Sequence, residues 1–393
     1  MELNTFLNLA LIIFLALLSS KLMKLFKLPN VTGYLIMGLI CGPYCLGLIQ
    51  KDTIDAFSVI PEVALGFIAF SIGSEFRLDY LKKVGKAPMI IAWCEGICAV
   101  LVVLLVLLLF GNELSFSLAL SAIAAATAPA ATLMVIKQYK AKGPVTQTLL
   151  PVVAIDDAVA LIAFGVAIAI VRVLNPVNGT SLVMTLLSPV KEIFGALLFG
   201  ALLGVCFTLL TKWFTGRGNR LAITYGMIFL CVGVSDMVGF SSLLACMAMS
   251  AVYINFSNSK ISNVVFEQTD RVTPPIFMLF FFLSGAELNL RLLPSVGLVG
   301  LLYIVFRVAG KVFGAYLGAK LSHAQPVVQK YLGFTLLPQA GVAIGLAATA
   351  MSAVPEFGEK IRTIILCGTV IYELTGPLIT KLTLKKAGEI AVE

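Results

Sequence analysis

Charged side chains are scarce in this sequence, at 12% of its 393 residues, while 60% are hydrophobic. A soluble domain carries about 25% charged residues, so this scarcity excludes a soluble globular protein. The eight cysteines include no Cys-x-x-Cys pair, and the single histidine, His323, lies between two apolar runs. We therefore expect neither a resident metal centre nor a disulfide framework.

Long apolar runs dominate instead, each of about 17–25 residues, which is enough to cross a hydrocarbon core ~30 Å thick. They predict an all-α polytopic membrane protein with about 13 transmembrane helices. The first run lacks a basic leader and an Ala-x-Ala cleavage site, so we interpret it as a retained span and not a signal peptide. The expected spans are 4–20, 30–49, 56–74, 87–110, 114–136, 144–171, 193–214, 221–236, 238–255, 272–286, 296–319, 328–352 and 363–380.

Lysine and arginine are distributed unevenly between the loops. The loops that follow odd-numbered spans hold 20 of them, whereas the other loops hold 6. The positive-inside rule then predicts a multi-pass protein of the cell (inner) membrane, with its N-terminus outside and a short cytoplasmic tail at 384–393. The net charge of +8 follows from this topology. We expect the lipid bilayer as a partner of the protein and do not expect nucleic acid.

Two halves of the chain resemble each other at a constant offset of 212 residues, which aligns GSEFRLDYL from Gly73 with GAELNLRLL from Gly285. The two spans concerned cross in opposite directions, so we predict an inverted-topology repeat, as in secondary transporters. Chance similarity between Gly- and Leu-rich helices is the alternative. The same offset aligns two interrupted apolar spans, which predicts two broken helices that cross at a binding site. The residues of this crossing are Thr127, Ala128, Pro129, Pro338, Gln339 and Gly341.

Two adjacent acids, Asp156 and Asp157, lie within the span 144–171. An acid at the bilayer centre costs ~2.5–3.5 kcal/mol, so the pair needs a reason. Side chains one residue apart diverge by about 100° on a helix. We therefore expect different partners, with Asp157 facing the crossing and Asp156 facing another helix, where Arg307 is its salt-bridge partner. A carboxylate in a partly hydrated cavity binds either a proton or a monovalent cation, and that competition couples the two ions.

Two further charged residues lie inside spans. Glu95 is about one third into the span 87–110, and Lys311 follows Arg307 by one helical turn. We expect this pair to belong to a cytoplasmic funnel or a pH-sensing cluster. Local hydrogen bonding near the membrane interface is the alternative.

Several of these features together resemble the bacterial monovalent cation:proton antiporters of the NhaA/NapA type. They are the Asp156-Asp157 pair, the Thr127-Ala-Pro interruption, the pattern FRVAGKVFGAYLGAK from Phe306 to Lys320 and the segment GAELNL. The resemblance implies an NhaA-like antiporter fold and a homodimer, in which a core domain moves against a dimerisation domain. It assigns 1–55 and 217–256 to dimerisation helices, 188–216 to a linker helix, and 56–173 and 264–383 to the two core repeats.

The resemblance also implies roles for the site residues. Asp157 would be the main ligand of the cation and the proton, with Asp156 and Thr127 completing the site. Many members carry a lysine where we align Arg307, and an arginine does not release its proton. A two-proton stoichiometry is therefore doubtful here. Relatives also often have a glutamate in the second interruption, where this chain reads Pro338-Gln339-Ala340-Gly341-Val342, so coordination or selectivity at that end is expected to differ.

We predict a secondary active transporter, not an enzyme, that needs no cofactor. It would exchange Na⁺ or Li⁺ for H⁺ by elevator-like alternating access and contribute to pH homeostasis. A K⁺/H⁺ antiporter and a sodium-coupled organic-solute symporter of related fold are the alternatives. An intramembrane aspartyl protease is disfavoured because its two acids must converge, whereas adjacent acids on one helix diverge. An ion channel is disfavoured because its filter is a ring of residues from several subunits.

Overall fold

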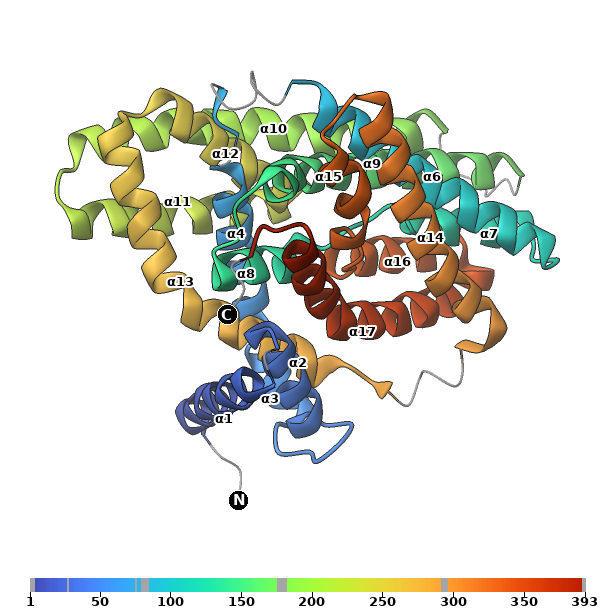
Figure 1. Ribbon diagram of the computed structural model, residues 1–393, viewed down its shortest axis with the longest axis horizontal. Coiled ribbons are helices and arrows are strands. Elements are labelled where there is room, and N and C mark those ends of the chain that lie inside the picture. The colour runs from blue at the N-terminus through green and yellow to red at the C-terminus, as the bar shows by residue number, and fades with distance from the viewer. Residues whose placement is uncertain are drawn as a thin grey trace. The chain divides into compact units, whose positions relative to one another are not determined.

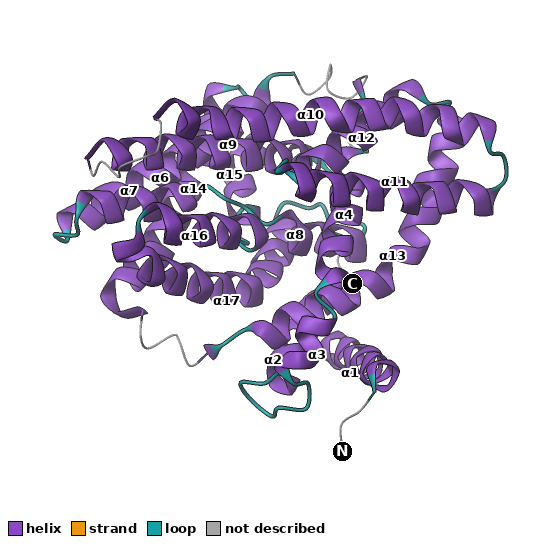
Figure 2. Ribbon diagram, turned by 180° about the vertical axis from the view of Figure 1, so that it is seen from behind, coloured by secondary structure: helices purple, strands orange, loops and turns teal. Residues whose placement is uncertain are grey.

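The structure, a computed structural model, describes residues 4–26, 28–74, 76–78, 85–174, 182–290 and 296–390. Every regular element within these ranges is a helix, which confirms the predicted all-α class (Figures 1 and 2). Seven of the helices are long and apolar enough to cross a membrane. The count of 13 spans stays a prediction. Parts of both repeat motifs, Glu75 and 79–81 in the first and 291–293 in the second, lie outside the described residues.

The chain divides into two compact units. The first consists of Met1–Lys27, Gly33–Val84 and Val190–Glu287, and the second of Leu28–Thr32, Gly85–Pro189 and Leu288–Glu393. This grouping differs from the predicted core ranges at two helices. The ranges 56–173 and 264–383 placed α4 (Val59–Gly73) and α13 (Ser259–Glu287) in the core, whereas both belong to the first unit. The roles of the units stay a prediction.

The helices of the first unit pack through small residues. Gly38 of α2 is one example, because a Cβ there would lie 2.0 Å from the carbonyl oxygen of Phe282 on α13. Two of the helix starts are capped by side chains, Asn4 accepting from the Leu7 amide at 2.9 Å and Ser241 from the Leu244 amide at 3.3 Å. Besides α4 and α13, this unit contains α1 (Thr5–Leu25), α3 (Lys51–Ala56), α11 (Arg217–Val238) and α12 (Ser242–Phe256), together with α2 (Asn30–Cys41) from Gly33 onward and α10 (Leu182–Trp213) from Val190 onward.

In the second unit, α6 (Ala87–Leu109) packs along α14 (Gly297–Leu321) (Figure 1). Glycines at every fourth position of α14 allow this approach. A Cβ on Gly310, Gly314 or Gly318 would lie 2.6–2.7 Å from backbone atoms of α6. Small residues at this spacing let two membrane helices bring their backbones together. The remaining helices are α7 (Leu114–Ile123), α8 (Pro129–Tyr139), α9 (Pro144–Leu174), α15 (Pro326–Tyr331), η2 (Leu332–Thr335), α16 (Gly341–Ala353) and α17 (Pro355–Lys386).

Two interruptions occur where the repeat predicts them. The first separates α7 from α8, and the second separates η2 from α16. The helices that follow them, α8 and α16, begin at Pro129 and Gly341, which are 212 residues apart. A proline supplies no backbone N–H and its ring crowds the preceding turn, which favours the breaks beside Pro129 and beside Pro338.

The helix that carries the two aspartates, α9, is anchored at its start by the end of the chain. The Glu389 carboxylate accepts from the Val145 amide at 2.5 Å, and from the Thr146 amide and hydroxyl at 2.8 and 2.6 Å. The Lys142 amide also donates to the Glu389 carbonyl at 3.0 Å. An acid at a helix N-terminus satisfies free amides and complements the helix dipole. The residues after α17 therefore hold the first turn of α9.

Replacing this cap is expected to destabilise the protein. Glu389→Ala leaves the amides of the first turn of α9 without an acceptor, which costs about 1–2 kcal/mol. The midpoint of thermal unfolding in detergent should therefore fall by a few degrees, whereas Glu359→Ala, at an exposed position of α17, should leave it unchanged. Equal midpoints for the two variants would show that Glu389 does not anchor α9.

Candidate ion-binding site

The two helix breaks meet within the second unit. The Ala128 amide of the first break donates to the Pro338 carbonyl of the second at 2.9 Å. In return, the Gln339 side-chain amide donates to the Ile123 carbonyl at the end of α7, at 3.0 Å. These bonds bring together the residues predicted to form the crossing. Pro129 and Gly341 begin the two helices that leave it.

Arg307 of α14 joins the two breaks through their backbone. Its Nε and Nη2 donate to the carbonyls of Ala124 and Ala126 at 3.1 and 2.7 Å, and Nη1 donates to the Leu337 carbonyl at 2.8 Å. The guanidinium also lies over the Tyr372 ring, 4.5 Å from its centroid. Helix ends leave carbonyls without partners inside the helix and carry partial negative charge. The fully buried Arg307 supplies both donors and charge there.

The predicted salt bridge between Asp156 and Arg307 is therefore wrong. The guanidinium is engaged by the carbonyls of the breaks, and the base bonded to Asp156 is Lys311, one turn further along α14. The Lys311 ammonium lies 3.3 Å from Asp156 Oδ2 and 2.8 and 2.9 Å from the two oxygens of Glu95. It also donates to the Ala125 carbonyl and to Thr127 Oγ1, both at 2.6 Å.

Glu95 and Lys311 are fully buried, with exposed fractions of 0%. Through Lys311 they are joined to Asp156. Their predicted role in a cytoplasmic funnel or a pH-sensing cluster stays a prediction. The close packing of α6 on α14 explains their contact, because Lys311 lies between two glycines of the packed stripe and Glu95 lies on the facing helix.

The two aspartates keep free acceptor oxygens inside the protein. Asp156 Oδ2 accepts from the Thr127 hydroxyl and from Lys311. The other oxygen, Oδ1, of both Asp156 and Asp157 is buried without a hydrogen-bond partner among the described residues. The exposed fractions of the two residues are 0% and 2%. Buried polar atoms are nearly always bonded, so these oxygens indicate a place for a proton or a cation.

Asp156 contacts the crossing directly, because it accepts from the Thr127 hydroxyl in the first break. That Asp157 faces the crossing stays a prediction. The formal charges leave an excess of one negative charge, because Glu95, Asp156 and Asp157 face two bases, Arg307 and Lys311. One proton or one monovalent cation balances that excess.

Sequence reasoning missed two tyrosines beside the crossing. The Tyr303 hydroxyl bonds to the Gln339 side chain, with O–O and N–O distances of 3.2 and 2.9 Å. The Tyr372 hydroxyl donates to the Ile304 carbonyl at 2.7 Å. A tyrosine inside an apolar span carries no pattern that distinguishes it from packing. The Gly310-x₃-Gly314-x₃-Gly318 stripe does indicate that another helix packs closely on α14, but it does not identify that helix or its Glu95.

The sequence matches the model of one protein family, described as "Sodium/hydrogen exchanger, transmembrane", over residues 10–386. The chain belongs to this family. It is 24% identical over 363 residues to the probable Na⁺/H⁺ antiporter GerT of Bacillus cereus, covering 90% of this chain and 92% of that protein. It is 25% identical over 379 residues to the Na⁺/H⁺ antiporter NhaS4 of Synechocystis, covering 86% and 87% of the two chains.

A solved structure shows the same fold. The sodium proton antiporter MjNhaP1 of Methanocaldococcus jannaschii superposes with a TM-score of 0.76 at 20% identity, covering 100% of both chains. The all-helical architecture predicted from the sequence is therefore that of the sodium/hydrogen exchanger family.

Loss of Arg307 is expected to destabilise the crossing. Arg307→Ala leaves three buried carbonyls without donors, at about 1–3 kcal/mol each, so the unfolding midpoint in detergent should fall strongly. Arg307→Lys restores one donor group and should recover part of the loss. Arg271→Ala is the control, because its ion pair with Glu267 is exposed and such pairs contribute ~0–1 kcal/mol. An Arg307→Ala protein as stable as the control would contradict this role.

Proposed function

We propose that the protein exchanges Na⁺ or Li⁺ for H⁺ across the cell membrane. One observation carries the proposal. Asp156 and Asp157 are adjacent, buried and each left with an unbonded oxygen beside a crossing of two broken helices. The membership of this chain in the sodium/hydrogen exchanger family supports the same conclusion. The relatives named as Na⁺/H⁺ antiporters favour Na⁺ over K⁺.

The ligand chemistry suits a small hard cation. Alkali and alkaline-earth cations prefer oxygen ligands, and carboxylates and hydroxyls are the groups available here. Asp157 is the main ligand in this proposal, with Asp156 and the Thr127 hydroxyl completing the site. A proton on the same carboxylates removes the charge that attracts the cation. The two ions therefore exclude each other, and this exclusion is sufficient to couple their movements.

Glu95 gives Lys311 a second carboxylate partner. The Asp156 contact, at 3.3 Å, is the longest that the ammonium makes, whereas both contacts with Glu95 are shorter than 3.0 Å. When a cation displaces Lys311 from Asp156, the ammonium keeps Glu95 and is not left as an unpaired buried charge, which would be costly. Glu95 therefore sets how strongly Lys311 competes with the cation.

We assign alternating access to movement of the second unit against the first. Every residue of the proposed site, from Glu95 to Gln339, belongs to the second unit, so that unit can carry the ion as one body. The first unit would then form the dimerisation domain of a homodimer, with the N-terminus outside and the C-terminus in the cytoplasm. The lysine and arginine distribution supports this sidedness.

The test uses purified protein in liposomes with an acidic interior and a trapped pH dye. Adding Na⁺ or Li⁺ outside should make the interior alkaline, and Asp157→Asn should abolish the response because it removes the main ligand and leaves only Asp156, which is bonded to Lys311. Asp236→Asn, at an exposed position of α11, is the matched control. A response to K⁺ alone would establish the K⁺/H⁺ alternative, and normal exchange by Asp157→Asn would contradict the proposed site. Protein that ignores all three cations but accumulates an organic solute with Na⁺ would be a symporter.

A second variant tests the role of Glu95. Glu95→Gln leaves Lys311 with Asp156 as its carboxylate partner, so the cation must displace a stronger ion pair. Coupling between close buried charges is worth about 1.5 kcal/mol or more, so the KM for Na⁺ should rise about tenfold or more at pH values where the wild type is active. The maximal rate should change little, and Glu113→Gln, at an exposed position, should change neither quantity. If Glu95→Gln lowers the unfolding midpoint but leaves the KM for Na⁺ unchanged, Glu95 has a structural role and does not affect cation binding.

A further inference from the structure

An apolar groove lies on the second unit, away from the ion site. Its cavity of about 760 Å³ is formed by α14, α15 and η2. The α14 side consists of residues at helical spacing, Val305, Val308, Ala309, Val312, Phe313 and Tyr316. Four large side chains along it remain substantially exposed, Val305 at 50%, Phe313 at 55%, Tyr316 at 42% and Phe334 at 40%.

The length of the groove corresponds to one leaflet of a bilayer. The eleven-residue step from Val305 to Tyr316 rises about 16 Å along a helix. Half of a hydrocarbon core ~30 Å thick is close to the same length. The opposite side of the groove, formed by α15 and η2, leads toward the membrane centre, because η2 ends at Thr335, next to the second helix break. The groove therefore extends from the depth of the crossing to the end of α14.

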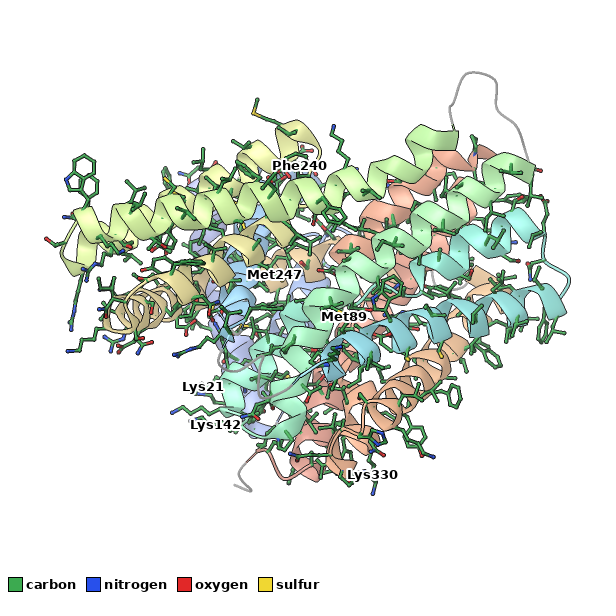
Figure 3. The ribbon with its side chains drawn as sticks, turned by 90° about the horizontal axis from the view of Figure 1, so that it is seen from above. Lys21, Met89, Lys142, Phe240, Met247 and Lys330 are labelled. Carbon is green, nitrogen blue, oxygen red and sulfur yellow. The ribbon has the colours of Figure 1, made fainter. Side chains whose placement is uncertain are left out.

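Among the described residues that line the groove, the positive charge lies at the end formed by α15. Lys330 and Gln329 of α15 line the groove there. Lys320, at the end of α14, lies with its ammonium 5.8 Å from the centroid of the Tyr316 ring. Lys330 is exposed, and Figure 3 shows its side chain extending away from the ribbon. Lys320 lies in the loop that follows the eleventh predicted span, and Lys330 lies at the start of the next span, beside the same loop. The positive-inside count therefore places both lysines on the cytoplasmic side.

We propose that this groove is a binding site for one anionic phospholipid of the cytoplasmic leaflet. An acyl chain would lie along Val305, Ala309 and Phe313, and the phosphate would bind Lys330 and Lys320. The combination of an apolar groove with lysines at one end favours an anionic lipid over other occupants. A protein helix would need no charge at one end, and a zwitterionic lipid would gain less from two lysines than an anionic one. The site is separate from the aspartate pair and does not depend on the exchanged ion.

Native mass spectrometry of the full-length protein in detergent tests the proposal, with phosphatidylglycerol and phosphatidylcholine of identical chains titrated in turn. Phosphatidylglycerol should bind more tightly. Because each lysine near an anionic headgroup contributes about fivefold in affinity, Lys330→Gln should weaken its binding about fivefold and the double variant with Lys320→Gln more. Lys260→Gln, an exposed lysine of the first unit, is the control and should have no effect.

A second variant probes the acyl-chain half of the site. Ala309→Phe places a ring into the groove at an exposed position, so it should reduce binding of both lipids without changing the unfolding midpoint. Equal affinity for the two headgroups, or binding that neither Lys330→Gln nor Ala309→Phe changes, would overturn the proposal. If Ala309→Phe leaves lipid binding unchanged but shifts the protein between monomer and dimer, a second copy of the chain covers the groove instead.

Discussion

The interaction on which the site depends is the positive charge that α14 brings to the interrupted end of α7. A break at membrane depth frees carbonyls that water cannot reach, and such groups are tolerated only when the protein satisfies them. Arg307 bonds to two of these carbonyls and Lys311 to a third. Arg307 also bonds to the opposite break, at Leu337, so the same side chain holds the two interruptions together.

The two bases on α14, Arg307 and Lys311, determine which acids near them are paired. A buried lysine requires a negative partner, and Glu95 can provide one because the glycine stripe of α14 lets α6 approach closely. With Lys311 bonded to Glu95, Asp156 and Asp157 carry more negative charge than the local bases neutralise. The structural need to stabilise broken helices and the functional need for an unbalanced carboxylate are thus met by neighbouring residues on α14 and α9.

The large features were predictable from the sequence, because they depend on long runs and on an internal repeat. The all-helical class and the breaks beside Pro129 and Pro338 are as the pattern predicted, and the two aspartates lie within one long helix, α9. The partner of Asp156 was not predictable. Arg307 and Lys311 are one turn apart on the same face of α14, and only the close packing of α6 decides which base meets which acid. The grouping of α4 and α13 with the first unit likewise depends on packing that the repeat does not encode.

The central claim is that a cation and a proton compete for the aspartate pair while Lys311 remains held by Glu95. Calorimetric titration of Na⁺ into the purified wild-type protein, in buffers with different ionisation enthalpies, measures the protons released for each cation bound. The account predicts that binding heat depends on the buffer, because Na⁺ expels a proton from the site. Na⁺ binding with the same heat in every buffer, across the pH range of binding, would contradict it.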